Sequence, residues 1–188
     1  MKRMFAILLA FFGWHDFDIT DGAISKSGSL YQIETPELRA TIKGSSGASL
    51  VTTFTYLGPT VQQSRLSDGE LRHQFALVLR AQDICNRVYI SVHFDTNEVY
   101  VQVKRNPGKV THKDCGDEGY TTVADWTVPP VRVGEPYYLS SRIVNTTLAV
   151  NTGGLSHLVK LPSTAFEFNG PAGLRTDNVR VRFSVEAE

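Results

Sequence analysis

Two neighbouring stretches of the chain carry polar and aromatic side chains at every second position, in a pattern suited to binding sugars. The polar and aromatic members of the stretches 87–94 and 98–104 are Arg87, Tyr89, His93, Tyr100, Gln102 and Lys104. The intervening positions hold Val88, Ile90, Val92 and Phe94, and then Val99, Val101 and Val103. Aromatic rings stack on sugar rings, and Arg or amide groups bind hydroxyls and carboxylates through paired hydrogen bonds.

The elements that must position these residues are two antiparallel strands. Asp95, Thr96 and Asn97 separate the stretches and predict a hairpin turn. Successive residues of a strand point to opposite faces of a sheet, so pairing with both valine rows inward places the polar residues on one contiguous surface. We call this predicted surface the polar platform.

Two upstream stretches have the same alternation and would widen the platform if their strands lie in the same sheet. Leu38, Ala40 and Ile42 form one apolar row, and Leu71, Phe75, Leu77 and Leu79 form another. The polar residues that these stretches would add to the platform are Arg39, Arg72, Gln74 and Arg80. The alternative for all of these residues is a solvated sheet face, which antiparallel sheets commonly have.

The charge around the platform favours an acidic ligand over a neutral one. Between residues 72 and 113 there are seven basic residues and three acidic ones. The same residue types also include the ingredients of a β-elimination on a uronate, which needs a group that neutralises the carboxylate and a group that moves the proton. Arg39 and Gln74 would neutralise, and Tyr100 or His93 would serve as base and acid.

The whole chain is balanced in charge, which argues against a general nucleic-acid binder. Lys and Arg total 19, as do Asp and Glu, whereas phosphate neutralisation requires a basic surplus. The length of 188 residues and the 41% hydrophobic content suit one globular domain. We expect that domain to span residues 14–188.

Cys85 and Cys115 are the only cysteines of the chain. They are too few and too far apart for a zinc site, so the sequence predicts no metal and no cofactor. In an oxidising compartment they would form a disulfide that closes a loop of about 30 residues and contributes roughly 3.5 kcal/mol. In the cytosol they would be two separate reduced thiols.

The N-terminus begins with Met1, Lys2 and Arg3, followed by an apolar run to Phe12. A charged start and a short apolar segment are typical of an export signal, so residues 1–13 are interpreted as an export signal or a leader remnant. The run is too short to span a bilayer, which takes about 20 residues. The location is thus predicted to be secreted or at the cell surface, and cytoplasmic if the run is instead a first strand.

Glycine and proline recur at short intervals along the rest of the chain, and the runs between them are rich in Val, Ile, Thr, Tyr and Phe. This spacing predicts an all-β sandwich or barrel. The segment Asp16–Asp21 is interpreted as an edge strand that ends in a turn at Asp21 and Gly22, rather than as a calcium loop, which needs oxygens converging on one point.

The segment 170–183, with the letters GPAGLRTDNVRVRF, resembles the closing strand of concanavalin A-like jelly rolls, a group that includes laminin G-like and glycan-active domains. The segment 137–150, interrupted near Asn145, is similar to the penultimate hairpin of that group. The resemblance implies two stacked antiparallel sheets in which the concave sheet binds or cleaves glycans. It speaks for the fold more than for an activity.

Two enzyme patterns of that group are incomplete in this sequence. The Glu-x-Asp-x-x-Glu pattern of its glucanases, which sets an acid and a nucleophile for glycoside cleavage, is not found. Glu37, Leu38 and Arg39 match the first motif of alginate-lyase-like members, but their Gln-x-His motif is missing because Gln74 directly follows His73. No catalytic residue is therefore assigned.

Three hypotheses follow. The leading one is a non-catalytic, lectin-like module that binds a polysaccharide or another glycan on the concave sheet. The alternatives are a polysaccharide lyase acting on an acidic polymer and a laminin G-like protein-interaction domain.

Overall fold

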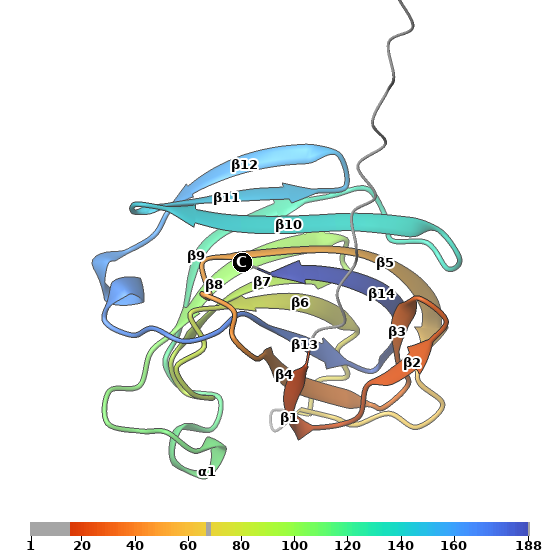
Figure 1. Ribbon diagram of the computed structural model, residues 1–188, viewed down its shortest axis with the longest axis horizontal. Helices are drawn as coiled ribbons and strands as arrows, with labels where there is room; N and C mark the ends of the chain where they lie inside the picture. The colour runs from red at the N-terminus through yellow and green to blue at the C-terminus, as the bar shows by residue number, and fades with distance from the viewer. Residues whose placement is uncertain (1–15, 67–68, 188) are drawn as a thin grey trace, which may run out of the picture.

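The β-branched and aromatic runs of the sequence form fourteen strands in the computed structural model, which describes residues 16–66 and 69–187 (Figure 1). The strands make two antiparallel sheets of seven that pack face to face. The predicted two-sheet antiparallel sandwich is therefore confirmed. The interpretation of residues 1–13 as a leader falls outside the described residues and stays a prediction.

The first sheet contains, in spatial order, β1 (Phe17–Asp21), β4 (Glu37–Ile42), β13 (Gly173–Asp177), β6 (Gln74–Leu79), β7 (Arg87–His93), β8 (Glu98–Lys104) and β9 (Tyr120–Thr127). The second contains β12 (Leu155–Lys160), β11 (Thr147–Thr152), β10 (Pro136–Val144), β5 (Ser49–Pro59), β14 (Val179–Ala187), β3 (Leu30–Ile33) and β2 (Ser25–Ser27). β13 comes from near the C-terminus, yet it lies between β4 and β6. Residues far apart in the sequence therefore become neighbours in the middle of the first sheet.

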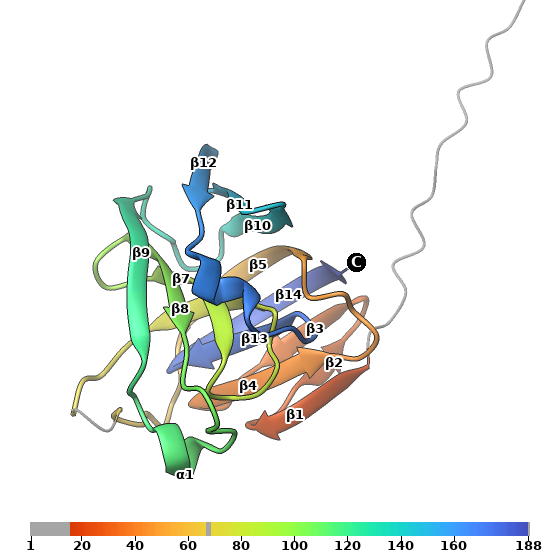
Figure 2. The ribbon, with the colours of Figure 1, turned by 90° about the vertical axis from the view of Figure 1, so that its left-hand side faces the viewer.

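Two short helical segments complete the described part of the chain, α1 (His112–Cys115) and η1 (Ser163–Phe166). α1 lies in the connection between β8 and β9, at the end of the molecule opposite β12 (Figure 2). Within residues 16–66 and 69–187 we find no helix whose length and hydropathy would suit a membrane span.

The predicted hairpin is present, and its register agrees with the proposed alternation. Tyr89 pairs with Gln102 and Arg87 pairs with Lys104 across β7 and β8, and Asn97 adopts a left-handed φ of 56° in the turn. The valines and the isoleucine of both apolar rows are at most 2% exposed, and Phe94, just after β7, is partly buried. The polar residues of the hairpin therefore share the face of the first sheet that points away from the second sheet, which we call the outer face.

The core lies between the two sheets and is rich in aromatic residues. Phe54 of β5 stacks on Phe75 of β6 with ring centroids 4.5 Å apart, and Phe183 of β14 meets Phe75 edge to face. All three are at most 1% exposed. Buried aromatic pairs of this kind hold the first sheet in a fixed position on the second.

The edge strand β1 ends at the predicted Asp21–Gly22 turn. Gly22 has a φ of +77°, and a Cβ atom at this position would lie 2.0 Å from the carbonyl oxygen of Glu37. Only glycine fits both the conformation and the close approach. The turn brings the end of β1 against the start of β4, where part of the candidate site lies.

Candidate functional site

One row of side chains on the outer face of the first sheet crosses five neighbouring strands. Arg39 of β4 pairs with Arg175 of β13, which pairs with Ala76 of β6, and the same row continues through Ser91 to Tyr100. The side chains of one row lie beside one another because neighbouring strands are in register. Eight residues of the predicted platform lie on this face: Arg39, Gln74, Arg87, Tyr89, His93, Tyr100, Gln102 and Lys104.

The middle of the outer face is held by a buried carboxylate, Asp177 of β13, which is 1% exposed. Its oxygens accept hydrogen bonds from Arg175 Nε at 2.9 Å, from Arg39 Nη2 at 2.7 Å and from the amide of Gln74. Burial alone would raise the pKa of this carboxyl group, but the two arginines and the amide outweigh it and hold the pKa below its usual value. We call these four residues the Asp177 network.

A pair of tyrosines lies next to this network. The rings of Tyr89 and Tyr120 stack with centroids 5.8 Å apart. Arg175 lies over the ring of Tyr89 at 5.6 Å and donates through Nη1 to the hydroxyl of Tyr120 at 3.2 Å. The ammonium of Lys104 lies 4.8 Å from the centre of the Tyr120 ring. Two hydroxyls and two cations thus meet in one place.

The electrostatic potential around this tyrosine pair is positive. Burial raises the pKa of the Tyr89 hydroxyl, but nearby positive charges outweigh burial and leave the pKa lowered. These charges belong to Arg87, Arg175, Arg39 and Lys104. The pKa of the Tyr120 hydroxyl is instead raised, chiefly by its burial. A ligand that carries negative charge is favoured at this position.

His93 and Tyr100 form a second aromatic contact on the same face, with ring centroids 4.7 Å apart. The hydroxyl of Tyr100 donates to Glu98 Oε2 at 2.6 Å, and this bond raises its pKa. Burial, with a further contribution from Arg72, lowers the pKa of His93 to about 4. His93 is therefore neutral at pH 7, so the positive potential of the outer face comes from its arginines and Lys104.

Three adjoining cavities lie on the outer face. The central cavity, of about 210 Å³, is lined by Tyr89, Tyr120 and Arg175. The Arg72 cavity, of about 220 Å³, shares these three residues and adds Arg72 and Gln102. The β1 cavity, of about 700 Å³, shares Glu37, Arg39, Ile84 and His112 with the central cavity. We call the three together the groove.

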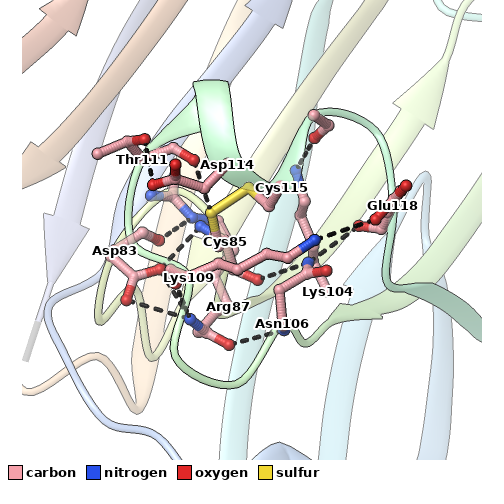
Figure 3. The surroundings of a disulfide bond; sticks show 12 residues. Asp83, Cys85, Arg87, Lys104, Asn106, Lys109, Thr111, Asp114, Cys115 and Glu118 are labelled. Carbon is pink, nitrogen blue, oxygen red and sulfur yellow. Dashed lines mark hydrogen bonds and ion pairs between the residues drawn. A yellow bond between two sulfur atoms is a disulfide. The ribbon is translucent and has the colours of Figure 1, made fainter.

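The loop from Arg105 to Gly119 forms one wall of the groove and is fixed by the predicted disulfide, which is present between Cys85 and Cys115 (Figure 3). Lys104 Nζ donates to the carbonyl oxygen of Gly116 at 2.5 Å, and Asn106 Nδ2 donates to the carbonyl oxygens of Cys85 and Glu118. These contacts tie the loop to the ends of β7 and β8. The loop contributes His112 and Asp117 to the lining of the central cavity.

The structure places one predicted platform residue elsewhere. Arg80 has a left-handed φ of 51°, and its guanidinium donates to the carbonyl oxygens of Ala165 and Phe168 beside η1. We therefore leave Arg80 out of the candidate site. Arg72 lies just before β6 and lines the groove, where its Nη2 pairs with Glu70.

Sequence reasoning missed several groove residues and the buried carboxylate that holds two of the arginines. The groove residues are Glu37, His112, Asp117, Tyr120 and Arg175, and the buried carboxylate is that of Asp177. For Arg175 and Asp177 a signal existed, because they alternate with Leu174 and Thr176 in the segment that was interpreted as the closing strand. Tyr120 and the loop residues carry no local pattern that would mark them.

Within the described residues, no group of three or more His, Cys, Asp or Glu side chains is arranged to hold a metal ion. The side chains that line the groove offer hydrogen bonds and charge. Guanidinium groups, amides and phenolic hydroxyls can bind hydroxyls, carboxylates or sulfates.

No protein-family model and no curated protein sequence matches the chain. Its fold does match solved structures. The carbohydrate-binding module CBM66 from Bacillus subtilis is 14% identical with a TM-score of 0.64, over 91% of this chain and 95% of that chain. Toad ovary galectin in complex with thio-digalactose is 12% identical with a TM-score of 0.50, over 81% of this chain and 99% of that chain.

A single-site variant of congerin II is 9% identical with a TM-score of 0.50, over 84% of this chain and 99% of that chain. At such low identities these likenesses show a shared fold. The chain therefore has the two-sheet jelly-roll sandwich fold of these structures, as the resemblance of the segment 170–183 implied.

Proposed function

We propose that the groove binds a glycan and that the protein is a non-catalytic recognition module. The observation that carries this proposal is the groove itself, where buried Arg175 and the tyrosine pair form the floor of two adjoining cavities. Concave sites with a few fixed polar groups are the usual form of a ligand site. The structural neighbours add support, because one is a carbohydrate-binding module and another is a galectin in complex with thio-digalactose.

The ligand that suits the groove best is an acidic glycan. The central and Arg72 cavities are lined by Arg39, Arg65, Arg72, Lys104 and Arg175, against the carboxylates of Glu37 and Asp117. Guanidinium groups bind carboxylates and sulfates through two parallel hydrogen bonds. The positive charges that lower the pKa of Tyr89 support the same choice, because they would attract an acidic group to this region.

We place the protein in an oxidising, extracellular or cell-surface setting. The disulfide between Cys85 and Cys115 supports this location, because such bonds persist mainly outside the cytosol. An acidic polysaccharide would be accessible to the groove in that setting.

The variant Arg72→Ala tests the binding proposal. Arg72 is partly exposed at the rim of the groove, so its loss should leave the fold intact. A charge-assisted hydrogen bond contributes about 1.5–3 kcal/mol, so affinity for an acidic polysaccharide should fall about tenfold or more in calorimetry. Arg132→Ala is the matched control, since Arg132 pairs with Glu135 outside the groove. Equal affinity of the two variants, or no binding on an array of acidic and neutral glycans, would contradict the proposal.

A second candidate function is β-elimination on a uronate polymer, and the lowered pKa of Tyr89 favours it. A phenolate at Tyr89 would take the C5 proton, and a double bond would form between C4 and C5 as the bond from C4 to the leaving oxygen breaks. The Tyr89 hydroxyl formed in this way would give the proton to the leaving oxygen and return to the phenolate. In the structure Arg39 and Gln74 donate to Asp177 and Tyr100 donates to Glu98. Tyr89, beside Arg175, is therefore the better proton acceptor.

This candidate predicts an unsaturated product that absorbs in the near ultraviolet. Incubation with uronate polymers should produce that absorbance, and Tyr89→Phe should abolish it while retaining binding, because the ring and its packing remain. Absence of product across a panel of uronate polymers that the protein binds would remove the lyase candidate and leave the binding module.

A further inference from the structure

The largest cavity of the groove is not the one that contains the tyrosine pair. The β1 cavity has a volume of about 700 Å³, and the central cavity has about 210 Å³. Its walls come from β1 and β4, from the segment 81–84 after β6, and from the disulfide-closed loop. A volume of this size lies within the range of about 300–1,000 Å³ that is typical of ligand sites.

The β1 cavity and the central cavity adjoin each other. Glu37, Arg39, Ile84 and His112 line both of them. A ligand seated over the tyrosine pair can therefore extend toward β1 by crossing the strands of the sheet, alongside the disulfide-closed loop.

The two ends of the groove differ in charge. The Arg72 cavity has two arginines, Arg72 and Arg175, and one carboxylate, Asp117. The β1 cavity has two arginines, Arg39 and Arg87, and three carboxylates, which are those of Asp21, Glu37 and Asp83. Carboxylates only accept hydrogen bonds, so they suit sugar hydroxyls and disfavour a second acidic group.

One of these carboxylates is held in place by the fold. Asp83 Oδ1 accepts from the backbone N–H of Cys85 at 2.8 Å and from Asn86 Nδ2 at 3.0 Å. The backbone of Asp83 also accepts from Arg87 Nε at 2.6 Å. The polar wall of the β1 cavity is therefore oriented before any ligand arrives, which lowers the entropy cost of binding.

We propose that the β1 cavity is a second sugar subsite that takes a neutral, hydroxyl-rich sugar, so that the groove binds an acidic unit and an adjacent neutral unit of a heteropolysaccharide. This inference rests on the proposed function and adds to it the composition and direction of the bound chain. The acidic unit lies over the tyrosine pair and the neutral unit lies toward β1.

Calorimetry with a short series of defined saccharides tests the subsite. The probes are glucuronic acid, a disaccharide of glucuronic acid with a neutral sugar, and a disaccharide of two uronic acids. The mixed disaccharide should bind at least tenfold more tightly than glucuronic acid alone. The affinity for the diuronate should exceed the affinity for glucuronic acid by less than threefold. Its second carboxylate would lie near the carboxylates of the β1 cavity and be repelled by them.

The variant Thr20→Trp separates the subsites. Thr20 is an exposed residue of the edge strand β1 and lines the β1 cavity, so a tryptophan would fill the cavity without disturbing the core. The variant should bind the mixed disaccharide only as tightly as glucuronic acid, with the affinity for glucuronic acid unchanged. Thr53→Trp is the matched control, because Thr53 is an exposed residue of β5 in the second sheet, and it should behave like wild type. If Thr20→Trp has a lower melting temperature than wild type, Gln82→Trp takes its place, because Gln82 lines another wall of the same cavity.

The outcomes distinguish the two proposals. If none of the three saccharides binds, the proposed function itself is contradicted. If glucuronic acid binds but neither chain length nor Thr20→Trp changes the affinity, the second subsite does not exist while the glycan site stands. If the diuronate binds as tightly as the mixed disaccharide, the proposal that the subsite prefers a neutral sugar is wrong.

Discussion

Replacing Asp177 with asparagine should lower the free energy of unfolding by about 3–5 kcal/mol, because the change leaves the buried Arg175 and the partly buried Arg39 without their carboxylate. Arg175 and Arg39 both donate to Asp177, and Arg175 is itself buried. Urea unfolding at pH 7 measures the loss. Thermal unfolding should show a decrease in melting temperature of about 6–20 °C for a domain of this size.

The same variant should change the response to acid. The pKa of Asp177 is depressed in the folded protein, so its contribution to stability is present above the unfolded pKa of about 4 and is lost as the pH falls through the lower folded pKa. The difference in stability between wild type and Asp177→Asn should therefore shrink as the pH falls below about 4. The control is Asp125→Asn, since Asp125 is exposed on β9 of the same sheet, and it should change stability by less than about 0.5 kcal/mol. A loss below about 1 kcal/mol in Asp177→Asn at pH 7 would show that the network does not support the fold.

The strands and the faces of the first sheet could be predicted because they depend on local alternation alone. Apolar residues at every second position of 87–94 and 98–104 must face one side, and their polar neighbours must then face the other. The turn at 95–97 makes the two strands neighbours, so the register of β7 and β8 followed from sequence. The segment 170–183, interpreted as one closing strand, instead contains β13 and the start of β14, which lie in different sheets on either side of Asn178 with its left-handed φ of 55°.

The order of the strands could not be predicted in the same way. β13 inserts between β4 and β6 although more than 90 residues separate it from β6 in the chain. That insertion is what brings Asp177 between Arg39 and Gln74. A contact of this kind depends on the whole fold, and no pattern within one strand signals it.

Arg80 shows a second reason why strand alternation cannot predict every side-chain position. The rule applies only while the backbone is extended, and β6 ends at Leu79. The left-handed φ of Arg80 turns its side chain toward η1, where it binds two carbonyl oxygens. Two residues later, Gln82 lines the β1 cavity, so the same departure from extended geometry shapes the groove.

The platform was expected to be an open surface, and part of it is buried. Tyr89, Arg87, Lys104 and Gln74 are each less than 9% exposed. The disulfide-closed loop and the Asp177 network account for this burial, because the loop accepts a hydrogen bond from Lys104 and Asp177 accepts one from Gln74. Fixed, partly buried donors discriminate among ligands better than a solvated face would, since a wrong ligand leaves them unpaired. The burial therefore favours specific recognition.

Removing the disulfide should lower both the stability and the affinity for glycan. Cys85 and Cys115 are separated by 30 residues, and a closed loop of this length contributes about 3.5 kcal/mol by restricting the unfolded chain. The double variant Cys85→Ala with Cys115→Ala should melt about 7–14 °C below wild type. Its affinity for an acidic glycan should also fall, because His112 and Asp117 line the groove only while their loop is held in place.

Reductant provides the matched control for this prediction. Wild type in reductant should behave like the double variant, whereas the double variant should be insensitive to reductant, since it has no other cysteine. The hydrogen bonds of Lys104 with Gly116 and of Asn106 with Glu118 do not involve sulfur. They should therefore remain without the disulfide and limit the loss of affinity. If stability falls while affinity stays unchanged, these polar contacts alone hold the wall of the groove and the disulfide serves only the fold. If neither changes, the bond does not constrain the loop at all.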